Sequence, residues 1–226
     1  MACAFVPAVG APRELTFTSR LLAAERRRRG APRGSRKLTC YWQVVLDLGW
    51  FRDRTAVMSL ARDHGVARAT AYRYVDEVIE VLAAEAPELP EALARAMADG
   101  LAFVILDGKV IPADRCREKT MSTKGESVDL WYSGKGRRHG GSIQAVASPA
   151  GCSLWVSPAE PGSVHDITAA RIHALQRSLR RLGERAFALL NQRWRALQHI
   201  TASSGKITGI TRAALVLTQY EHGCIK

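Results

Sequence analysis

The sequence predicts an α+β protein, with helices in its first half, a small and mainly antiparallel sheet in its second half, and helices again near its end. Three observations predict this class. Between residues 38 and 98 apolar side chains recur at the three- and four-residue spacing of helices. Residues 101–106 are a continuous apolar run of strand length. Residues 142–148 and 153–157 have strand character and flank a Pro-Ala-Gly turn.

Composition and charge narrow the classes of protein that fit. The chain has 226 residues, 47% of them hydrophobic, so it can bury a core and a wholly disordered protein is not expected. Its 33 basic and 21 acidic residues give a net charge of +12. Such a charge is typical of proteins with a polyanionic partner, either nucleic acid or an anionic membrane surface. No apolar run reaches the roughly 18 residues that span a bilayer, and the N-terminus lacks the pattern of a signal peptide.

The five cysteines are scattered, and no two of them form a Cys-x-x-Cys pair. This spacing supports neither a zinc finger nor a disulfide framework. We therefore expect a reduced, cytoplasmic setting, in association with the nucleoid. The five tryptophans are expected mostly in the core or at interfaces.

The first expected unit is a basic flexible arm over residues 1–37. Between Arg13 and Lys37 nine basic and two acidic residues give a local net charge of +7, and two glycines and a proline are expected to break any helix. A solvated tail without a ligand is the alternative. The candidate phosphate contacts of the arm are Arg26, Arg27, Arg28 and Arg29.

The second expected unit, over residues 38–98, is a helix-turn-helix DNA-binding domain. An apolar face that includes Val57 and Leu60 is followed by Gly65 and then by a longer amphipathic helix over residues 67–84. Two helices joined by a short glycine-containing turn are the helix-turn-helix pattern. An ordinary helical hairpin with solvated charges is the alternative. The candidate DNA contacts on the second helix are Arg68, Thr70 and Arg73, with Tyr72 beside them.

The third expected unit covers residues 99–226. The run 101–106 predicts a buried strand that ends at Asp107, and residues 108–141 are expected to be irregular. A carboxylate on a rigid strand end suits a hard divalent cation, and phosphoryl transfer on DNA commonly uses two such ions about 3.5–4 Å apart. Taken alone, however, Asp-Gly more often marks a turn. Helices are expected over residues 164–182, 184–197 and 210–219.

Four segments, in this order, resemble the DDE-type transposases of the Harbinger-like bacterial insertion-sequence class, which are DDE superfamily endonucleases. The segments are ARDHGVARATAYRYVDE, LDGKVIPADR, the block from WYSGKGRRHGG to HDITAARIHAL, and LGERAFALLNQRW. The resemblance spans roughly residues 35–222. It implies a truncated ribonuclease-H-like catalytic domain over residues 99–226, behind the helix-turn-helix domain.

The resemblance also implies a site and its partners. Asp107 and Glu184 stand at positions that are metal ligands and catalytic residues in the family, which uses Mg²⁺ or Mn²⁺ in a two-metal site. The implied partner is double-stranded DNA at terminal inverted repeats, with a homo-oligomer possible in such systems and no membrane partner. Basic residues of a glycine-rich turn are further candidate phosphate contacts, with a solvated turn as the alternative: Lys135, Arg137 and Arg138.

The chain departs from the family pattern at the second catalytic aspartate. Asp166 and Glu184 are 18 positions apart, none of the residues between them is Asp, and no Asp-x-Gly-Tyr occurs in the chain. We interpret this as an internal deletion near residues 177–180, so a transposase-like protein with defective DNA cleavage and strand transfer is expected. Two alternatives stay open: a DNA-binding-only remnant that acts through its helix-turn-helix, and a chain that folds stably only at its N-terminal helices. His165 and Asp166 are expected to cap a helix rather than to bind metal.

Overall fold

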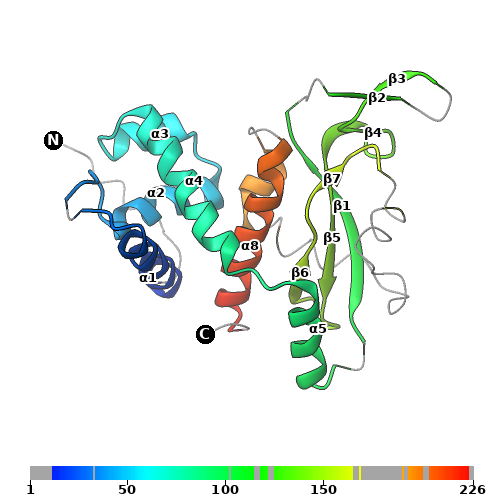
Figure 1. Cartoon of the computed structure of the whole chain (residues 1–226), viewed down its shortest axis with the longest axis horizontal. Helices are drawn as coiled ribbons and strands as arrows, with labels where there is room; N and C mark the ends of the chain where they lie inside the picture. Colours follow the sequence, from blue (N-terminus) through cyan, green and yellow to red (C-terminus); the bar gives the residue numbers. More distant parts are fainter. Residues whose placement is uncertain are drawn as a thin grey trace.

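The computed structural model describes residues 12–32, 34–101, 103–114, 118–121, 125–164, 168, 190, 193–200 and 204–223. Over these residues the chain is an α+β protein with a small antiparallel sheet (Figure 1). The helices are α1 (Pro12–Arg28), α2 (Cys40–Asp53), α3 (Val57–Asp63), α4 (Arg68–Ala84), α5 (Leu89–Ala98) and α8 (Ile207–Glu221). The strands are β1 (Ile105–Pro112), β2 (Lys119–Met121), β3 (Ser127–Asp129), β4 (Tyr132–Ser133), β5 (Arg138–Ala147), β6 (Ser153–Val156) and β7 (Glu160–Pro161). Two 3-10 helices, η2 (Arg195–Gln198) and η3 (Ser204–Lys206), precede α8.

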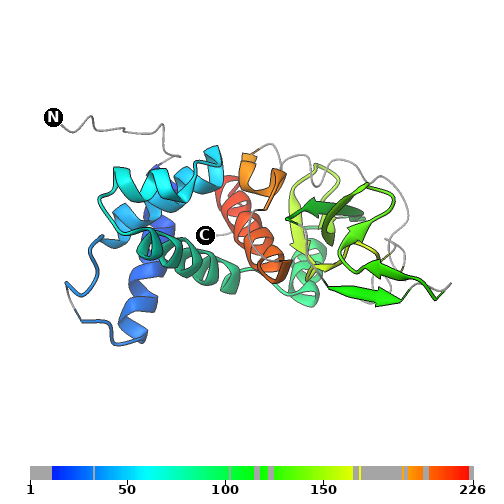
Figure 2. The ribbon, with the colours of Figure 1, turned by 90° about the horizontal axis from the view of Figure 1, so that it is seen from above.

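Helices α1 to α4 form a helical unit at one end of the molecule (Figures 1 and 2). Thr39 caps α2, because its side chain accepts a hydrogen bond from the backbone N–H of Trp42 at 3.4 Å. Between α3 and α4, Gly65 has φ +62°, a left-handed conformation that favours glycine. The helix predicted over residues 67–84 is present as α4. The residues predicted for its inner face are all buried: Ala71, Tyr74, Val75, Val78, Ile79 and Leu82.

Helix α1 differs from the flexible arm expected over residues 1–37. Its residues 12–28 are helical, and Leu15 and Leu22 are buried in the core. Phe17 stacks on Tyr220 of α8 with the ring centroids 4.1 Å apart. The physical reason is that the apolar residues at helical spacing bury one face of the helix, while the glycines at 30 and 34 follow its end instead of interrupting it.

The sheet is built around β5. Strand β1 pairs with β5 antiparallel from Ile105↔Ala147 to Pro112↔Gly140, and β6 pairs with the other side of β5. The turn between β5 and β6 contains Gly151 at φ +89°. The two strands predicted on either side of the Pro-Ala-Gly turn are therefore confirmed as β5 and β6.

Strand β1 begins later than the sequence predicts. Of the apolar run 101–106, only Ile105 and Leu106 belong to the strand, which continues through Gly108 to Pro112. The residues from Gly108 onward were expected to be irregular, and that expectation is wrong for this segment. The reason is tertiary, because β5 supplies backbone partners along the whole of β1 whatever its side chains are. Asp107 consequently lies inside a strand and not at its end.

Helix α8 lies between the helical unit and the sheet (Figures 1 and 2). It is buried on nearly all sides, as expected of a helix with packed neighbours all round. Gln219 donates hydrogen bonds from Nε2 to the backbone carbonyls of Ser153 and Leu154 in β6, at 3.0 and 2.9 Å. On the other side, Arg212 donates to the carbonyl of Ala86 at 3.0 Å, just after α4. Helix α5 covers the opposite face of the sheet, where its Ala92 packs with the buried Val146 and Trp155.

Several predicted elements fall outside the described residues. The helix expected over 164–182 does so apart from Val164 and Thr168, and Glu184, His165 and Asp166 do so entirely. The helix expected over 184–197 is described only near its end, where η2 is a 3-10 helix. Among the described residues, no helix is both long enough and apolar enough to cross a membrane.

Candidate nucleic-acid interface and catalytic face

Helix α4 presents basic side chains on its solvent side. Arg68 and Arg73 are exposed, whereas Thr70 is half-buried. The guanidinium carbon of Arg68 lies 5.7 Å from the ring centroid of Tyr72, and Arg73 donates to the hydroxyl of Thr70 at 3.3 Å. Both contacts are to uncharged groups, so they leave the positive charge of the two guanidinium groups uncompensated. Of the predicted outward residues of this helix, Arg68, Tyr72 and Arg73 are therefore exposed, and Thr70 is not.

The four arginines at the end of α1 differ in their surroundings. Arg26 donates to the carbonyl of Leu38 at 3.4 Å and also to the side chain of Gln43. Arg28 and Arg29 share the carboxylate of Glu25, at 2.7 and 2.5 Å. These hydrogen bonds, first from Arg28 and then from Arg29, lower the pKa of Glu25 to about 2.

The consequence is that Arg26 has a structural role, joining α1 to the start of α2. Arg28 and Arg29 carry charge that Glu25 partly balances, and Arg29 also lies 3.6 Å from Glu80 of α4. Arg27 is exposed. The sequence alone predicted one common role for these four arginines, as phosphate contacts. In the structure they differ, because Arg26 bonds within the protein, Arg28 and Arg29 pair with Glu25, and Arg27 is exposed.

Asp107 lies on β1 opposite Ala145 of β5. Side chains alternate between the faces of a strand, so Asp107 shares its face with Ile105 and Lys109. Its neighbour Gly108 faces Gln144, and a Cβ at position 108 would come within 2.8 Å of the Gln144 amide. Gly108 thus lies inside a strand and not in the turn that an Asp-Gly pair suggests, and a side chain at this position would have to displace the Gln144 amide.

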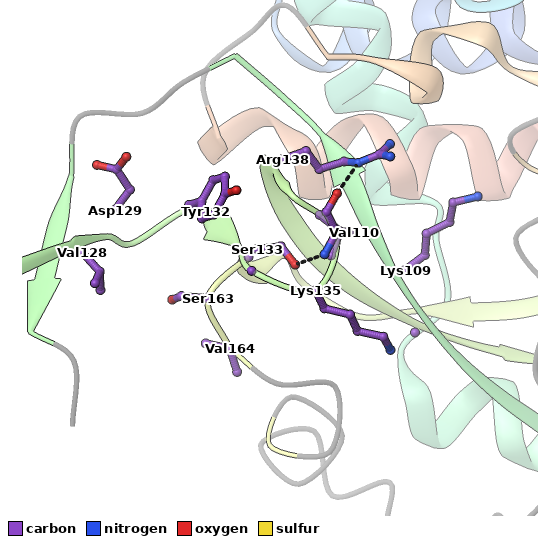
Figure 3. A pocket seen from close by; sticks show the side chains of 14 residues that line it. Lys109, Val110, Val128, Asp129, Tyr132, Ser133, Lys135, Arg138, Ser163 and Val164 are labelled. Atoms are coloured by element: carbon purple, nitrogen blue, oxygen red, sulfur yellow. Dashed lines mark hydrogen bonds between the residues drawn. The ribbon is translucent and has the colours of Figure 1, made fainter. Parts of the chain in front are cut away.

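A cavity of about 630 Å³ opens beside β1. Cationic side chains from three elements border it: Lys109 of β1, Lys135 of the glycine-rich turn and Arg138 of β5 (Figure 3). The hydroxyl of Ser133 accepts a hydrogen bond from the backbone N–H of Gly136 at 3.1 Å, and Arg138 donates to the Gly136 carbonyl at 3.0 Å. These bonds fix the turn, and Arg137 within it has φ +48°. The cavity can therefore receive an anion against a preformed wall.

One carboxylate also borders the cavity, and it has basic partners. Asp129 lies 2.5 Å from the ammonium of Lys119 and 3.3 Å from Nε2 of His139. The Tyr132 ring packs edge-on against His139, with the centroids 5.1 Å apart. Asp129 therefore adds little net negative charge to this wall, and the cationic character of the cavity is preserved.

Glycines let three stretches of backbone meet near this cavity. A Cβ on Gly140 would come within 2.1 Å of the carbonyl oxygen of Ile111. A Cβ on Gly162 would come within 2.6 Å of the carbonyl oxygens of Gly140 and Trp131. Gly162 thus has a packing role, and the Ser163 that follows it borders the cavity.

The described residues do not assemble a divalent-cation site. Of the two expected ligands, Asp107 is described and Glu184 is not. Within the described ranges, no group of three His, Cys, Asp or Glu side chains is arranged to hold a metal ion. In addition, Lys109 places a positive charge on the same face of β1 as Asp107. The described residues therefore do not by themselves support a metal-dependent reaction step.

The part of the chain that forms β1, the basic cavity and the β5–β6 hairpin is similar in sequence to a known family. Residues 106–181 match the DDE superfamily endonucleases. This endonuclease-like segment, about a third of the chain, contains Asp107 and every residue that borders the cavity. It ends before Glu184 and does not reach the helical unit. No curated protein and no solved structure matches the chain.

Sequence reasoning missed two features of these surfaces. Lys109 borders the cavity, and its position two residues after Asp107 on a strand was the signal that could have found it. Trp42 was expected in the core or at an interface; with 51% of it exposed it does not lie in the core, and the interface stays a prediction. Nothing in the local sequence marks that exposure, because α2 is apolar on several sides.

Proposed function

We propose that this chain is a DNA-binding protein of the transposase type whose strand-cutting chemistry is impaired. The observation that carries the proposal is the match of residues 106–181 to the DDE superfamily endonucleases. That segment contains both Asp107 and a cationic cavity wide enough for a phosphodiester. The family resemblance and the local chemistry therefore favour the same partner.

Two basic surfaces support duplex DNA as that partner. On α4, Arg68 and Arg73 stand on the exposed side of a helix that follows a short glycine-containing turn. In a helix-turn-helix such a helix enters the major groove, where arginine contacts guanine edges and phosphates. At the cavity, Lys109, Lys135 and Arg138 would balance the charge of a phosphodiester beside β1.

The finer proposal follows the Harbinger-like insertion-sequence class. According to this proposal, the protein binds the terminal inverted repeats of a transposable DNA element, and a homo-oligomer joins the two ends of that DNA. Asp107 and Glu184 would hold Mg²⁺ or Mn²⁺, which in such enzymes activates the attacking oxygen and stabilises the leaving oxygen. Asp107 itself contributes a half-buried carboxylate on a strand that β5 holds along its whole length.

The proposed defect has a physical cause. The 17 residues between Asp166 and Glu184 contain no aspartate, so the middle acid of the family's three is missing. Its loss removes an oxygen ligand and about one negative charge from a site for two dications. We expect a cost larger than the roughly 10–100-fold that follows loss of a residue supporting a ligand.

A nicking assay tests the catalytic part. Supercoiled plasmid is incubated with the full chain and either Mg²⁺ or Mn²⁺, with Asp107→Ala as the matched control. We expect the wild-type chain to nick no faster than Asp107→Ala. Metal-dependent nicking that Asp107→Ala abolishes would contradict the defect while supporting the endonuclease assignment.

A salt titration tests DNA binding separately. Arg68→Ala and Arg73→Ala are each expected to reduce the slope of log affinity against log salt by about 0.9, since each removes one phosphate or base-edge cation. The control is Arg95→Ala, because Arg95 is exposed on α5 and pairs with Glu91 at 2.6 Å. Binding without nicking is the result that the proposal expects, and absence of binding at low salt would contradict it.

A further inference from the structure

Two aromatic side chains at the start of α2 are exposed. Tyr41 and Trp42 are 50% and 51% exposed, and their rings meet edge to face with the centroids 5.5 Å apart. By contrast, the indoles of Trp155 and Trp194 are buried. A tryptophan with half of its surface exposed leaves apolar area in contact with water. Such exposed aromatic residues are common at sites that bind a partner.

The aromatic pair lies against the turn between α3 and α4. The ring centroids of Trp42 and His64 are 6.1 Å apart, and His64 is the residue that follows α3. Lys37, just before α2, donates from Nζ to the carbonyl of Gly65 in the same turn. Arg68 begins α4 three residues later. The start of α2 and the start of α4 therefore share one surface.

The charge around this surface identifies the chemistry of its partner. From Arg36 to Arg73 the chain has seven basic and three acidic residues, and Asp47, one of the three, is fully buried. Asp63 lies at the end of α3 as an exposed acid. The net positive charge favours a polyanion over a second copy of this equally basic chain.

We propose that Trp42, with Tyr41 beside it, packs against the sugar-phosphate backbone of duplex DNA next to the groove that α4 enters. The inference rests on the proposed DNA binding of α4. A major groove is about 12 Å wide, so elements beside a helix that enters it meet the backbone at its edge. The turn at Gly65 and the start of α2 are those elements. The indole ring covers deoxyribose, and its N–H donates to a phosphate oxygen.

A contact between Trp42 and the DNA backbone can be tested without knowing the target sequence. A contact to sugar and phosphate is independent of base sequence, so it forms on any duplex. A neutral ring also releases no counterions, unlike an arginine. Trp42→Ala should therefore weaken binding by the same factor at every salt concentration, about tenfold for the loss of this apolar area.

The test is a fluorescence-anisotropy titration of a labelled duplex of arbitrary sequence over a range of salt, using the full chain. Trp42→Ala is expected to lower affinity without changing the salt slope, whereas Arg68→Ala changes the slope. Trp42→Phe keeps a ring but loses the N–H donor, and should bind between wild type and Trp42→Ala. Phe103→Ala is the matched control, since Phe103 is 50% exposed outside the helical unit. It should bind as wild type does.

The outcomes separate this inference from the proposal on which it rests. Wild-type binding that Trp42→Ala leaves unchanged would overturn the inference alone. A reduced salt slope in Trp42→Ala would also overturn it, because the ring would then be acting through a neighbouring cation. A wild-type dimer that Trp42→Ala dissociates, with DNA binding unchanged, would assign this surface to a second copy. Failure of the wild-type chain to bind any duplex would overturn both.

Discussion

Asp47 of α2 is buried at the centre of the helical unit. Its side chain is fully inaccessible, and among the described residues neither carboxylate oxygen has a hydrogen-bond partner. Burial raises the pKa of Asp47 well above its ordinary value of 3.8, because a charge in this setting has no solvent to stabilise it. The carboxyl therefore stays protonated in the folded protein at pH values well above 3.8.

The free energy of unfolding should depend on this group. In the unfolded chain Asp47 ionises above about pH 4, whereas in the folded chain it does so only at a much higher pH. The stability it contributes is thus fully present below about pH 4 and is lost as the pH rises toward the folded pKa. Asp47→Asn, which stays neutral, should therefore be more stable than wild type at pH values well above about 4.

Urea unfolding at several pH values measures this difference. The gain from Asp47→Asn should shrink to nothing below about pH 4, where both forms are neutral. Asp53→Asn, an exposed position on the same helix, should show no such gain. Equal stability of wild type and Asp47→Asn across the range would show that the Asp47 carboxylate has a partner that stabilises its charge.

Gly140 tests the close approach of β5 to β1 near the cavity. A methyl group there would collide with the backbone of Ile111, which cannot rotate away. Gly140→Ala should therefore destabilise the fold by about 3 kcal/mol or more. Gly134→Ala, where no atom lies within 4 Å of the added Cβ, should have little effect. Thermal unfolding of the two variants measures the difference, and equal melting temperatures would contradict this packing.

At the scale of elements, the contacts of α1 show that residues 12–28 are part of the core and not a flexible arm. Leu22 is fully buried. At the far side of the helix, Arg193 lies 3.7 Å from Glu14 and makes two hydrogen bonds through Nε to Glu221, at 2.7 and 3.0 Å. Burial raises the pKa of Glu14 to about 8. A helix held by these contacts is an integral part of the fold.

Truncation of Leu22 tests that conclusion. Leu22→Ala should cost about 2–5 kcal/mol in the free energy of unfolding, as for other buried leucines. Arg27→Ala, on the exposed side of the same helix, should cost less than about 0.5 kcal/mol. Chemical denaturation gives both values. If Leu22→Ala were as stable as Arg27→Ala, the segment would be the flexible arm that its composition suggests.

Strand β1 shows at the same scale what an apolar run does not determine. The run 101–106 is the most strand-like segment of the sequence, yet the strand is centred on a more polar stretch. Hydrogen bonding to β5 fixes where the two strands pair, and the small size of Gly140 allows the close approach of the Ile111 backbone. The effect is to place Asp107 inside the strand, directly before the β1 residues that line the cavity, Gly108 to Val110.

At the scale of the whole molecule, α8 makes the helical unit and the sheet one structure. It is bonded to β6 through Gln219 and to the end of α4 through Arg212. Lys206, just before α8, lies 2.6 Å from Asp76 of α4. The buried residues of α4, β5 and α8 also belong to one hydrophobic core. We therefore expect the helical unit and the sheet to unfold together.

Limited proteolysis and calorimetry test this expectation. A single calorimetric transition is expected, and a protease should not release a stable fragment over residues 38–98 alone. Release of that fragment, or two separate transitions, would support a chain that folds stably only at its N-terminal helices. The result also bears on the proposed function, because a single cooperative structure would hold the exposed face of α4 and the basic cavity in a fixed position relative to each other.

The sequence by itself determined the α+β class, the helical character of residues 38–98, helices α4 and α8, the β5–β6 hairpin and the inner face of α4. These depend on spacing and turn residues within short segments, so local physics suffices. The sequence also determined the net positive charge and the absence of aspartate between Asp166 and Glu184, which require no structure. It identified Asp107 and the glycine-rich turn as candidates but could not show that Lys109 lies with them.

Only the tertiary structure decided the rest. In the folded chain, α1 is part of the core, and β1 continues past Asp107. Arg26 is hydrogen-bonded to Gln43, whereas Arg68 and Trp42 are exposed. Each of these depends on which element packs against which, over separations of tens of residues. A local pattern shows which side of a helix or strand is apolar. Whether that side is buried, and which strand pairs with which, depends on residues far away in the sequence that come close only in the folded chain.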